Sequence, residues 1–430
     1  MKIVMMTNTY LPHVGGVARS VDCFARGYRE RGHDVLVVAP EFPGAPDDEP
    51  DVIRIPAIQN FNGSDFSVVL PVPGFLERAV DRFQPDIIHS HHPFLIGSTA
   101  LRLSSRLDCP LVFTHHTMYE QYTHYVPGDS EVLKRFVVRL STSYANLCDQ
   151  VFAPSESIAG VLRQRGVRTP IDVVPTGVEL AQFTRGDGAA FRRRHRIPQD
   201  AFVIGHVGRL APEKNLRFLA RSVARVLVSH PRAHFLVVGA GPSESDIRQA
   251  CVEAGVVGRL HLAGKQMMPA LADAYHAMDL FAFASESETQ GMVLAEAMAA
   301  GLPVVAIDAP GAREVVADGH NGRLLSAPGE ELFARALEEA LTMDPQGRRA
   351  WKLGVAETAE RYSQQRCVDQ ALSLYSRLES GGEADREEHD AWHASLRRIR
   401  AEWELLKGMA RAAGVAARDE ESDGDEQRPG

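Results

Sequence analysis

The chain has 430 residues, 44% of them hydrophobic, with a formal net charge of −9 at pH 7. This length exceeds one typical domain and suits two domains with additional segments. The acidic balance argues against a general nucleic-acid-binding protein.

Cysteine usage and hydropathy indicate the compartment. The five cysteines are scattered and form no CxxC pair, which is typical of a reducing compartment without structural zinc. The N-terminal apolar run is too short for a signal peptide, and no apolar run approaches the ~20 residues of a membrane-spanning helix. We therefore expect a cytoplasmic protein, with peripheral contact at the inner face of the cell membrane left open.

The first half of the chain alternates strand-like and helical segments. The apolar run 2–7 leads into a loop with Gly15 and Gly16, and helical spacing then covers 18–31. Further strand-like runs, several of them ending in polar or small residues, follow at 33–40, 86–92, 109–116, 149–155 and 171–178. The alternation predicts a parallel, doubly wound sheet, in which ligands collect at the carboxyl ends of the strands.

The second half repeats this organisation without repeating the sequence. Residues 185–200 are charged and poor in apolar residues, so we interpret them as the crossing between domains. Strand-like runs then recur at 202–208, 234–241, 260–264, 280–285 and 302–307. We predict an N-terminal Rossmann-like domain over 1–184 and a second one over 185–378, whose last helices could cross back to the first.

Residues 379–430 differ from both domains. Apolar residues from Trp392 to Leu406 recur at steps of four and three, which predicts an amphipathic helix after a linker. Self-association or packing through 392–406 is one interpretation, and membrane contact is the other, because two tryptophans lie beside several arginines. After Arg418 the chain is acidic and lacks apolar runs, which predicts a disordered tail.

The stretch Ser285–Val305 carries the most specific chemistry. Glu288 and Glu296 are separated by seven residues, and a helix is predicted to begin near Gly291 between them. The free N–H groups of a helix start bind anions, above all phosphates. Two acids beside that start could hold hydroxyls on either side of a diphosphate, and a diphosphate flanked by two polyols is a nucleotide sugar.

Two cations follow the first strand of the second half. Arg209 and Lys214 are either solvated charges at a turn or ligands of the same diphosphate, and their place at a strand end favours the second interpretation. No DxD motif appears where a divalent ion would usually be held, which predicts a metal-independent mechanism. Gly15 and Gly16 are either an ordinary turn or a backbone approach to the donor, and without GxGxxG a dinucleotide cofactor is not expected.

Histidines and tyrosines gather after two strands of the first half. His115 and His116 end one strand, and three further histidines lie at the end of the preceding one. No acid at ligand spacing completes a metal site, so we expect most of these histidines to be hydrogen-bonded structural groups. One or two could meet sugar hydroxyls, and the nearby aromatic rings could line a sugar or lipid pocket on the acceptor side. The acceptor-side candidates are Tyr119, Tyr122 and His124.

Over residues 1–378 the chain resembles the retaining GT-B glycosyltransferases of family 4. The matching motifs are PHVGGV (12–17), TxHT (114–117), PTGV (175–178), GRLAPEKN (208–215) and the E-x7-E element with EAMAAGLPVV. The resemblance implies two Rossmann-like domains facing across a cleft. Thr176 stands where the family motif usually has asparagine, and the extension beyond Gly381 has no counterpart in the motifs.

The resemblance also implies roles for residues. Glu288 would contact donor sugar hydroxyls, Glu296 the ribose, and Arg209 and Lys214 the diphosphate. His116 would line the sugar site. The catalytic set that the resemblance implies is His116, Glu288, Arg209 and Lys214. The remaining donor-binding positions would be Gly15, Gly16, Lys265, Gln266, Gly291, Met292 and Val293, besides Glu296.

Within the family, ETQG (288–291) and HTMYEQYTHYV (116–126) are most similar to bacterial diacylglycerol glucosyltransferases. This implies transfer of glucose from UDP-glucose to a lipid hydroxyl, with no tightly bound cofactor or metal. The alternatives are a GDP-mannose-dependent or other hexosyltransferase with a different lipid or soluble acceptor, a non-hydrolysing nucleotide-sugar epimerase, and an inactive adaptor.

Overall fold

The chain forms two compact units. The computed structural model describes residues 1–13, 15–46, 49–58, 68–69, 74–120, 130–286 and 288–386. The first unit contains the described residues of Met1–Pro175 and the described chain from Cys367, and the second contains those of Thr176–Arg366. The division therefore precedes the predicted crossing at 185–200, which lies within the second unit because Phe191 and Ile197 are buried in that unit's core.

The first unit is built on a seven-stranded parallel sheet with the order β3-β2-β1-β6-β7-β8-β9. Its strands are short, mostly buried runs, as expected for a sheet covered on both faces. They are β1 (Lys2–Met6), β2 (Asp34–Pro40), β3 (Val52–Ile55), β6 (Ile87–Ser90), β7 (Leu111–Thr114), β8 (Gln150–Ala153) and β9 (Ile171–Val173). A separate antiparallel pair joins β4 (Ala57–Ile58) to β5 (Val68–Val69).

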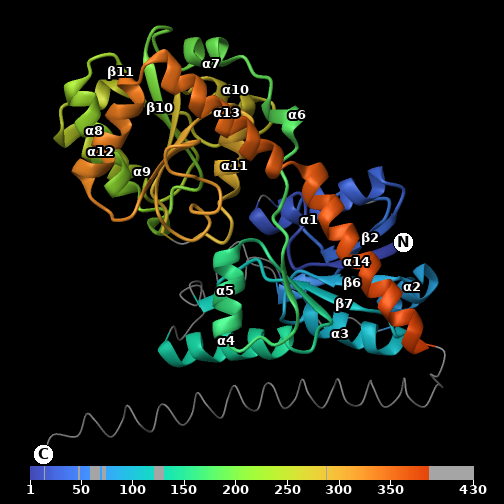
Figure 1. The fold of residues 1–430 in the computed structure, drawn as a ribbon. Helices are drawn as coiled ribbons and strands as arrows, with labels where there is room; N and C mark the ends of the chain where they lie inside the picture. Colours follow the sequence, from blue (N-terminus) through green and yellow to red (C-terminus); the bar gives the residue numbers. More distant parts are fainter. Residues whose placement is uncertain are drawn as a thin grey trace, which may run out of the picture. The chain divides into compact units, whose positions relative to one another are not determined.

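Helices cover both faces of this sheet (Figure 1). One face packs against α2 (Phe75–Phe83), α3 (Ile96–Leu107), α4 (Glu131–Ala145) and α5 (Glu156–Gln164). The other packs against α1 (Gly16–Glu30) and α14 (Gln364–Arg386). Helix α14 starts in the second unit and buries Val368, Ala371 and Tyr375 in the first unit's core. The C-terminal part of the described chain thus stabilises the N-terminal sheet.

The second unit repeats the architecture with a six-stranded parallel sheet of order β12-β11-β10-β13-β14-β15. The strands are β10 (Phe202–Val207), β11 (Ala233–Val238), β12 (Leu260–Leu262), β13 (Leu280–Phe283), β14 (Val304–Ile307) and β15 (Gly322–Leu325). The strand order reverses between β10 and β13, and such a switch point is where doubly wound sheets bind ligands. The predicted pair of doubly wound α/β units is confirmed.

Helices of the second unit also lie on two faces (Figure 1). One face carries α8 (Leu216–Ser229), α9 (Glu244–Glu253) and α12 (Glu330–Thr342). The other carries α6 (Leu180–Phe183), α7 (Gly188–Arg194), α10 (Ala270–His276), α11 (Met292–Ala299) and α13 (Pro345–Arg361). Short 3₁₀ turns occur at η3 (Pro212–Lys214) and η4 (Val257–Arg259). In the described part of the chain, no helix combines the length and apolar character that crossing a bilayer requires.

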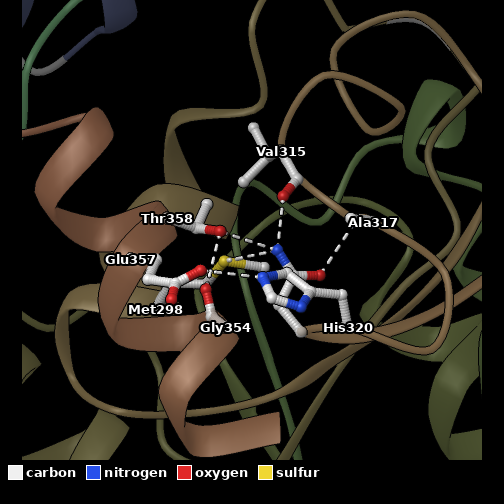
Figure 2. Close-up of polar contacts among 8 residues, drawn as sticks. Met298, Val315, Ala317, His320, Gly354, Glu357 and Thr358 are labelled. Carbon is white, nitrogen blue, oxygen red and sulfur yellow. Dashed lines mark hydrogen bonds and ion pairs between the residues drawn. The ribbon is translucent and has the colours of Figure 1, made fainter.

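A buried asparagine fixes the back of α11 (Figure 2). Asn321 is fully buried; its Nδ2 donates to the Val315 carbonyl (2.8 Å) and to Thr358 Oγ1 (2.9 Å), and lies 3.6 Å from Met298 Sδ. Its Oδ1 accepts a hydrogen bond from the Ala317 N–H at 2.8 Å. Because Met298 lies on α11 and Thr358 on α13, this amide holds both helices to one loop.

We expect Asn321→Ala to destabilise the second unit by about 2–3 kcal/mol, because it leaves buried partners without hydrogen bonds. Calorimetry should show the transition of this unit lowered by about 5–10 °C. The neighbouring His320→Ala is the matched control. His320 pairs with Glu357 at 3.0 Å, but their side chains are 50% and 67% exposed, so its loss should change the midpoint little. Equal shifts in the two variants would contradict the assignment.

Candidate functional site

Helix α11 begins at the switch point of the second sheet, where its first backbone N–H donors lie. The predicted helix is confirmed, with Gly291 as its N-cap residue in the left-handed region (φ +72°, ψ 49°). No side chain of the described residues caps this start by a hydrogen bond, and its first turn contains no acid. The N–H groups that follow Gly291 include those of Met292 and Val293, and a helix start of this kind is suited to binding an anion.

Glycine is required at this N-cap for a physical reason. A Cβ at Gly291 would lie 3.0 Å from the Gly311 carbonyl oxygen and 3.0 Å from Leu294 Cδ1. The positive φ adds strain for any residue with a side chain. Gly291 thus lets the chain turn sharply from the loop after β13 into α11.

An ion pair joins the two loops at the switch point. The Lys214 ammonium contacts the Glu288 carboxylate, and the two side chains are only 17% and 18% exposed. The Asn215 amide also donates to Glu286 Oε1 at 3.3 Å, and the Ser285 hydroxyl donates to the Glu213 carbonyl at 3.3 Å. The loop after β10 and the loop after β13 are therefore tied together, although 74 positions separate Lys214 from Glu288.

Arg209 lies on the same loop in a more solvated position. Its guanidinium contacts Glu213 Oε1 at 2.6 Å, and its side chain is 51% exposed. The structure thus places Arg209, Lys214 and Glu288 on the two connected loops that precede α11.

Glu296 has a different environment from Glu288. Its side chain is 1% exposed, and its Oε2 accepts a hydrogen bond from the Tyr275 hydroxyl at 2.8 Å. Tyr275, on α10, is fully buried. The two carboxylates of the E-x7-E element therefore differ. Glu288 forms a partly exposed ion pair with Lys214, whereas Glu296 is buried on α11 against Tyr275 of α10.

The sequence did not reveal the residue that anchors this loop. Gln290, which is 5% exposed, accepts from the Thr176 N–H and donates to the Thr176 carbonyl, each at 2.7 Å. This double contact fixes the residue before Gly291 to the first residue of the second unit. A glutamine beside a glycine carries no signal of a backbone partner 114 positions away.

Lys265 and Gln266 follow β12 at the same carboxyl edge. Lys265 is exposed, while Gln266 Nε2 donates to the Ala263 carbonyl at 2.6 Å. Strands β11 and β10 lie between β12 and β13 in the sheet. Among the described residues, no hydrogen bond or ion pair joins Lys265 or Gln266 to the Lys214–Glu288 pair.

In the first unit, Gly15 and Gly16 form the start of α1. Gly15 is an extended N-cap without a side-chain cap. A Cβ at Gly16 would meet no atom within 4 Å, so packing does not require glycine there. Open backbone at a helix start is suited to close approach by an anionic ligand.

The histidines after β6 and β7 divide into distinct environments. His89 contacts the Tyr375 hydroxyl at 2.5 Å and Thr114 Oγ1 at 2.6 Å, and burial lowers its pKa to about 3. His92 Nδ1 accepts the Asn8 N–H at 3.1 Å, and burial lowers its pKa to about 3 as well. These two are structural hydrogen-bonding groups, as expected.

His116 is half-buried, and its Nε2 lies 2.9 Å from Nδ1 of the fully buried His91. Tyr119 packs edge-on against Phe94 and His115. Among the described residues, no group of three or more His, Cys, Asp or Glu side chains could hold a metal ion. Tyr122, His124 and the segment 392–406 lie outside the residues that the structure describes.

Two family models of glycosyltransferases together match most of the described chain. Residues 14–182 match the family model "Glycosyltransferase Family 4", and residues 187–354 match "Glycosyl transferases group 1". The alpha-monoglucosyldiacylglycerol synthase of Streptococcus pneumoniae is 29% identical over 358 residues, spanning 80% of this chain and 79% of the relative. The GDP-mannose-dependent alpha-mannosyltransferase of Mycolicibacterium smegmatis is 31% identical over 349 residues, spanning 80% and 88%.

Solved structures agree in fold. The Anabaena protein HepE in complex with UDP and glucose matches with a TM-score of 0.66 and 22% identity, covering 87% of this chain and 99% of that one. Sucrose-phosphate synthase of Thermosynechococcus elongatus matches with a TM-score of 0.71 and 20% identity, covering 88% and 99%. At these identities the likeness supports the GT-B fold class alone.

We expect Gly291→Ala to destabilise the second unit by about 2–3 kcal/mol, because left-handed strain adds to two tight contacts. Gly301→Ala, after the other end of α11, is the matched control. Gly301 has a similar φ of +82°, but a Cβ there meets nothing within 4 Å, so only about 1 kcal/mol should be lost. Urea unfolding measures both variants. A Gly301→Ala loss as large as that of Gly291→Ala would contradict the contact argument.

Proposed function

We propose that this chain, which belongs to the glycosyltransferases of family 4, transfers glucose from UDP-glucose to a lipid hydroxyl such as that of diacylglycerol, with retention at the anomeric carbon. The observation that carries the proposal is the Lys214–Glu288 pair beside the uncapped start of α11. We further propose that the reaction uses no tightly bound cofactor or metal, and that the enzyme works at the inner face of the cell membrane.

The charges at the switch point account for the chemistry of the second unit. Departure of the nucleotide leaves negative charge on its diphosphate, and fixed donors and cations lower the energy of that state. The amides after Gly291, with Arg209 and Lys214, would supply them. Glu288 would hold hydroxyls of the transferred sugar, and Glu296 would meet the ribose.

The pairing of Lys214 with Glu288 has a consequence for catalysis. Each side chain is largely buried and already oriented by the other, so little reorganisation is needed when the donor arrives. A lysine that holds a carboxylate on one side can still bind phosphate with its remaining N–H groups. The pair would thus link the sugar end of the donor to its leaving group.

The acceptor side of the proposal is supported by similarity and by ring chemistry. Relatives from Streptococcus pneumoniae and Acholeplasma laidlawii are described as alpha-monoglucosyldiacylglycerol synthases. In the first unit, Tyr119 and Phe94 form an aromatic pair with ring centroids 5.0 Å apart, which suits a sugar or lipid pocket. Tyr122 and His124 would complete it. Residues 392–406 would contact the membrane surface or a second copy of the chain.

A GDP-mannose-dependent mannosyltransferase is the second candidate. The relative of that description from Mycolicibacterium smegmatis has the higher identity of the two compared above, 31%. The two candidates share the phosphate chemistry and differ in the base, the sugar and the acceptor. Lys265 and Gln266 are the residues that we propose meet the base.

We expect UDP to raise the melting temperature of the protein more than GDP or ADP does, because at equal concentration the ligand with the higher affinity for the native state stabilises it more. With UDP-glucose and diacylglycerol in mixed micelles, the product should be an α-glucosyl lipid, identified by mass spectrometry and NMR. Preference for GDP together with mannosyl transfer would establish the second candidate. No stabilisation by any nucleotide would contradict both.

We expect Glu288→Ala and Lys214→Ala each to lower turnover by about 100- to 1,000-fold, because each removes a charge that acts on the reacting donor. Arg225→Ala is the matched control. Arg225 lies on α8 and contacts Glu330 at 3.5 Å with its side chain 50% exposed, so turnover should stay near wild type. Circular dichroism checks the fold of each variant. Near-wild-type turnover in either site variant would contradict the site.

A further inference from the structure

The contact between His91 and His116 joins a buried group to a half-buried one. His91 follows β6, has no solvent-exposed surface, and places Nδ1 at 2.9 Å from His116 Nε2. The two ring planes differ by only 22°, with centroids 5.2 Å apart. The ring of His91 also packs against the ring of His89, with ring centroids 4.2 Å apart. His89 is itself held by hydrogen bonds with Tyr375 and Thr114. The ring of His91 is therefore fixed in position.

Both rings are neutral at physiological pH. Burial lowers the pKa of His91 and of His116 well below 6.5, and the neighbouring histidines lower both further. A neutral imidazole carries its proton on one nitrogen only. The 2.9 Å contact thus contains one proton, which belongs either to His91 Nδ1 or to His116 Nε2.

The surroundings of His91 decide between these arrangements. Its Nε2 is buried and has no hydrogen-bond partner among the described residues. If His116 were the donor, His91 would carry its proton on Nε2 and bury an unpaired N–H. If His91 is the donor, its Nε2 is an unpaired acceptor instead. In proteins, buried donors without a partner are rarer than buried acceptors without one, so the arrangement with His91 as the donor is favoured.

We propose that His91 is a positioning residue that donates its Nδ1–H to His116 and thereby holds His116 in the tautomer with the proton on Nδ1. His116 then presents an N–H donor, and its ligand is a hydrogen-bond acceptor such as a sugar hydroxyl oxygen. The assignment of that ligand rests on the proposed function, whereas the tautomer does not.

The tautomer can be measured without turnover. In protein labelled with ¹⁵N-histidine, the His116 signals are identified by their loss in His116→Gln. We expect a protonated Nδ1 and an unprotonated Nε2 in the wild-type protein. A protonated Nε2 on His116 would overturn the proposal, whatever reaction the enzyme catalyses.

The kinetic test separates positioning from packing. His91→Asn keeps an amide donor near the position of Nδ1, so it should retain the His116 tautomer and most of the turnover. His91→Leu fills similar space without a donor, so His116 should become a mixture of tautomers. We expect kcat to fall about 10- to 100-fold, the usual effect of losing a partner that orients a functional histidine. UDP binding should stay unchanged, because His91 is not among the proposed ligands of the nucleotide.

The chain contains a matched control. His234 and His261 repeat the geometry, with Nδ1 and Nε2 2.9 Å apart and ring centroids at 5.2 Å, in the second unit. His234 lies near the start of β11, at the opposite end of the sheet from the switch-point loops. His234→Leu should therefore leave kcat unchanged. Equal kcat in His91→Leu and wild type, or equal losses in His91→Leu and His91→Asn, would contradict the role of His91.

Discussion

The second unit depends on the connection between two loops that leave adjacent parallel strands. Lys214 and Glu288 form an ion pair with little solvent exposure, and Gln290 is clamped to the Thr176 backbone. Together they determine where the chain turns at Gly291 and therefore where the donors of α11 point. Removing a partner from such a pair leaves a poorly solvated charge, so the loops depend on each other.

The same constraint extends to the back of α11. Met298 contacts Asn321, and Asn321 also bonds to Thr358 of α13, so the helix is held at its far end as well as at its start. Glu296 adds a buried hydrogen bond to Tyr275 of α10. A helix of eight residues has little stability of its own. Its orientation comes from these polar contacts and from the apolar core around it.

Sequence reasoning predicted the elements whose signal is local. Short apolar runs gave the principal strands, and Gly291 marked the start of α11 because a glycine precedes a stretch of good helix formers. Contacts between distant positions carried no such signal. The Gln290–Thr176 clamp, the burial of Glu296 and the return of α14 to the first sheet each depend on tertiary packing. The charge of residues 185–200 suggested a linker, but two buried apolar side chains, Phe191 and Ile197, bind it to the second core.

The two units differ in the charge of the side chains at their strand ends, which are ionic in the second unit and neutral histidines in the first. In the second unit, Lys214, Glu288 and Arg209 are ionic and arranged around backbone donors, which suits a multiply charged diphosphate. In the first unit, burial lowers the pKa of His91 and of His116 and so favours their neutral forms, which suits hydrogen bonding to hydroxyl groups. A neutral imidazole has a donor and an acceptor side, and only a fixed partner decides which side faces the ligand. Positioning of His116 by a buried neighbour is therefore the counterpart, in the first unit, of the Lys214–Glu288 pair in the second.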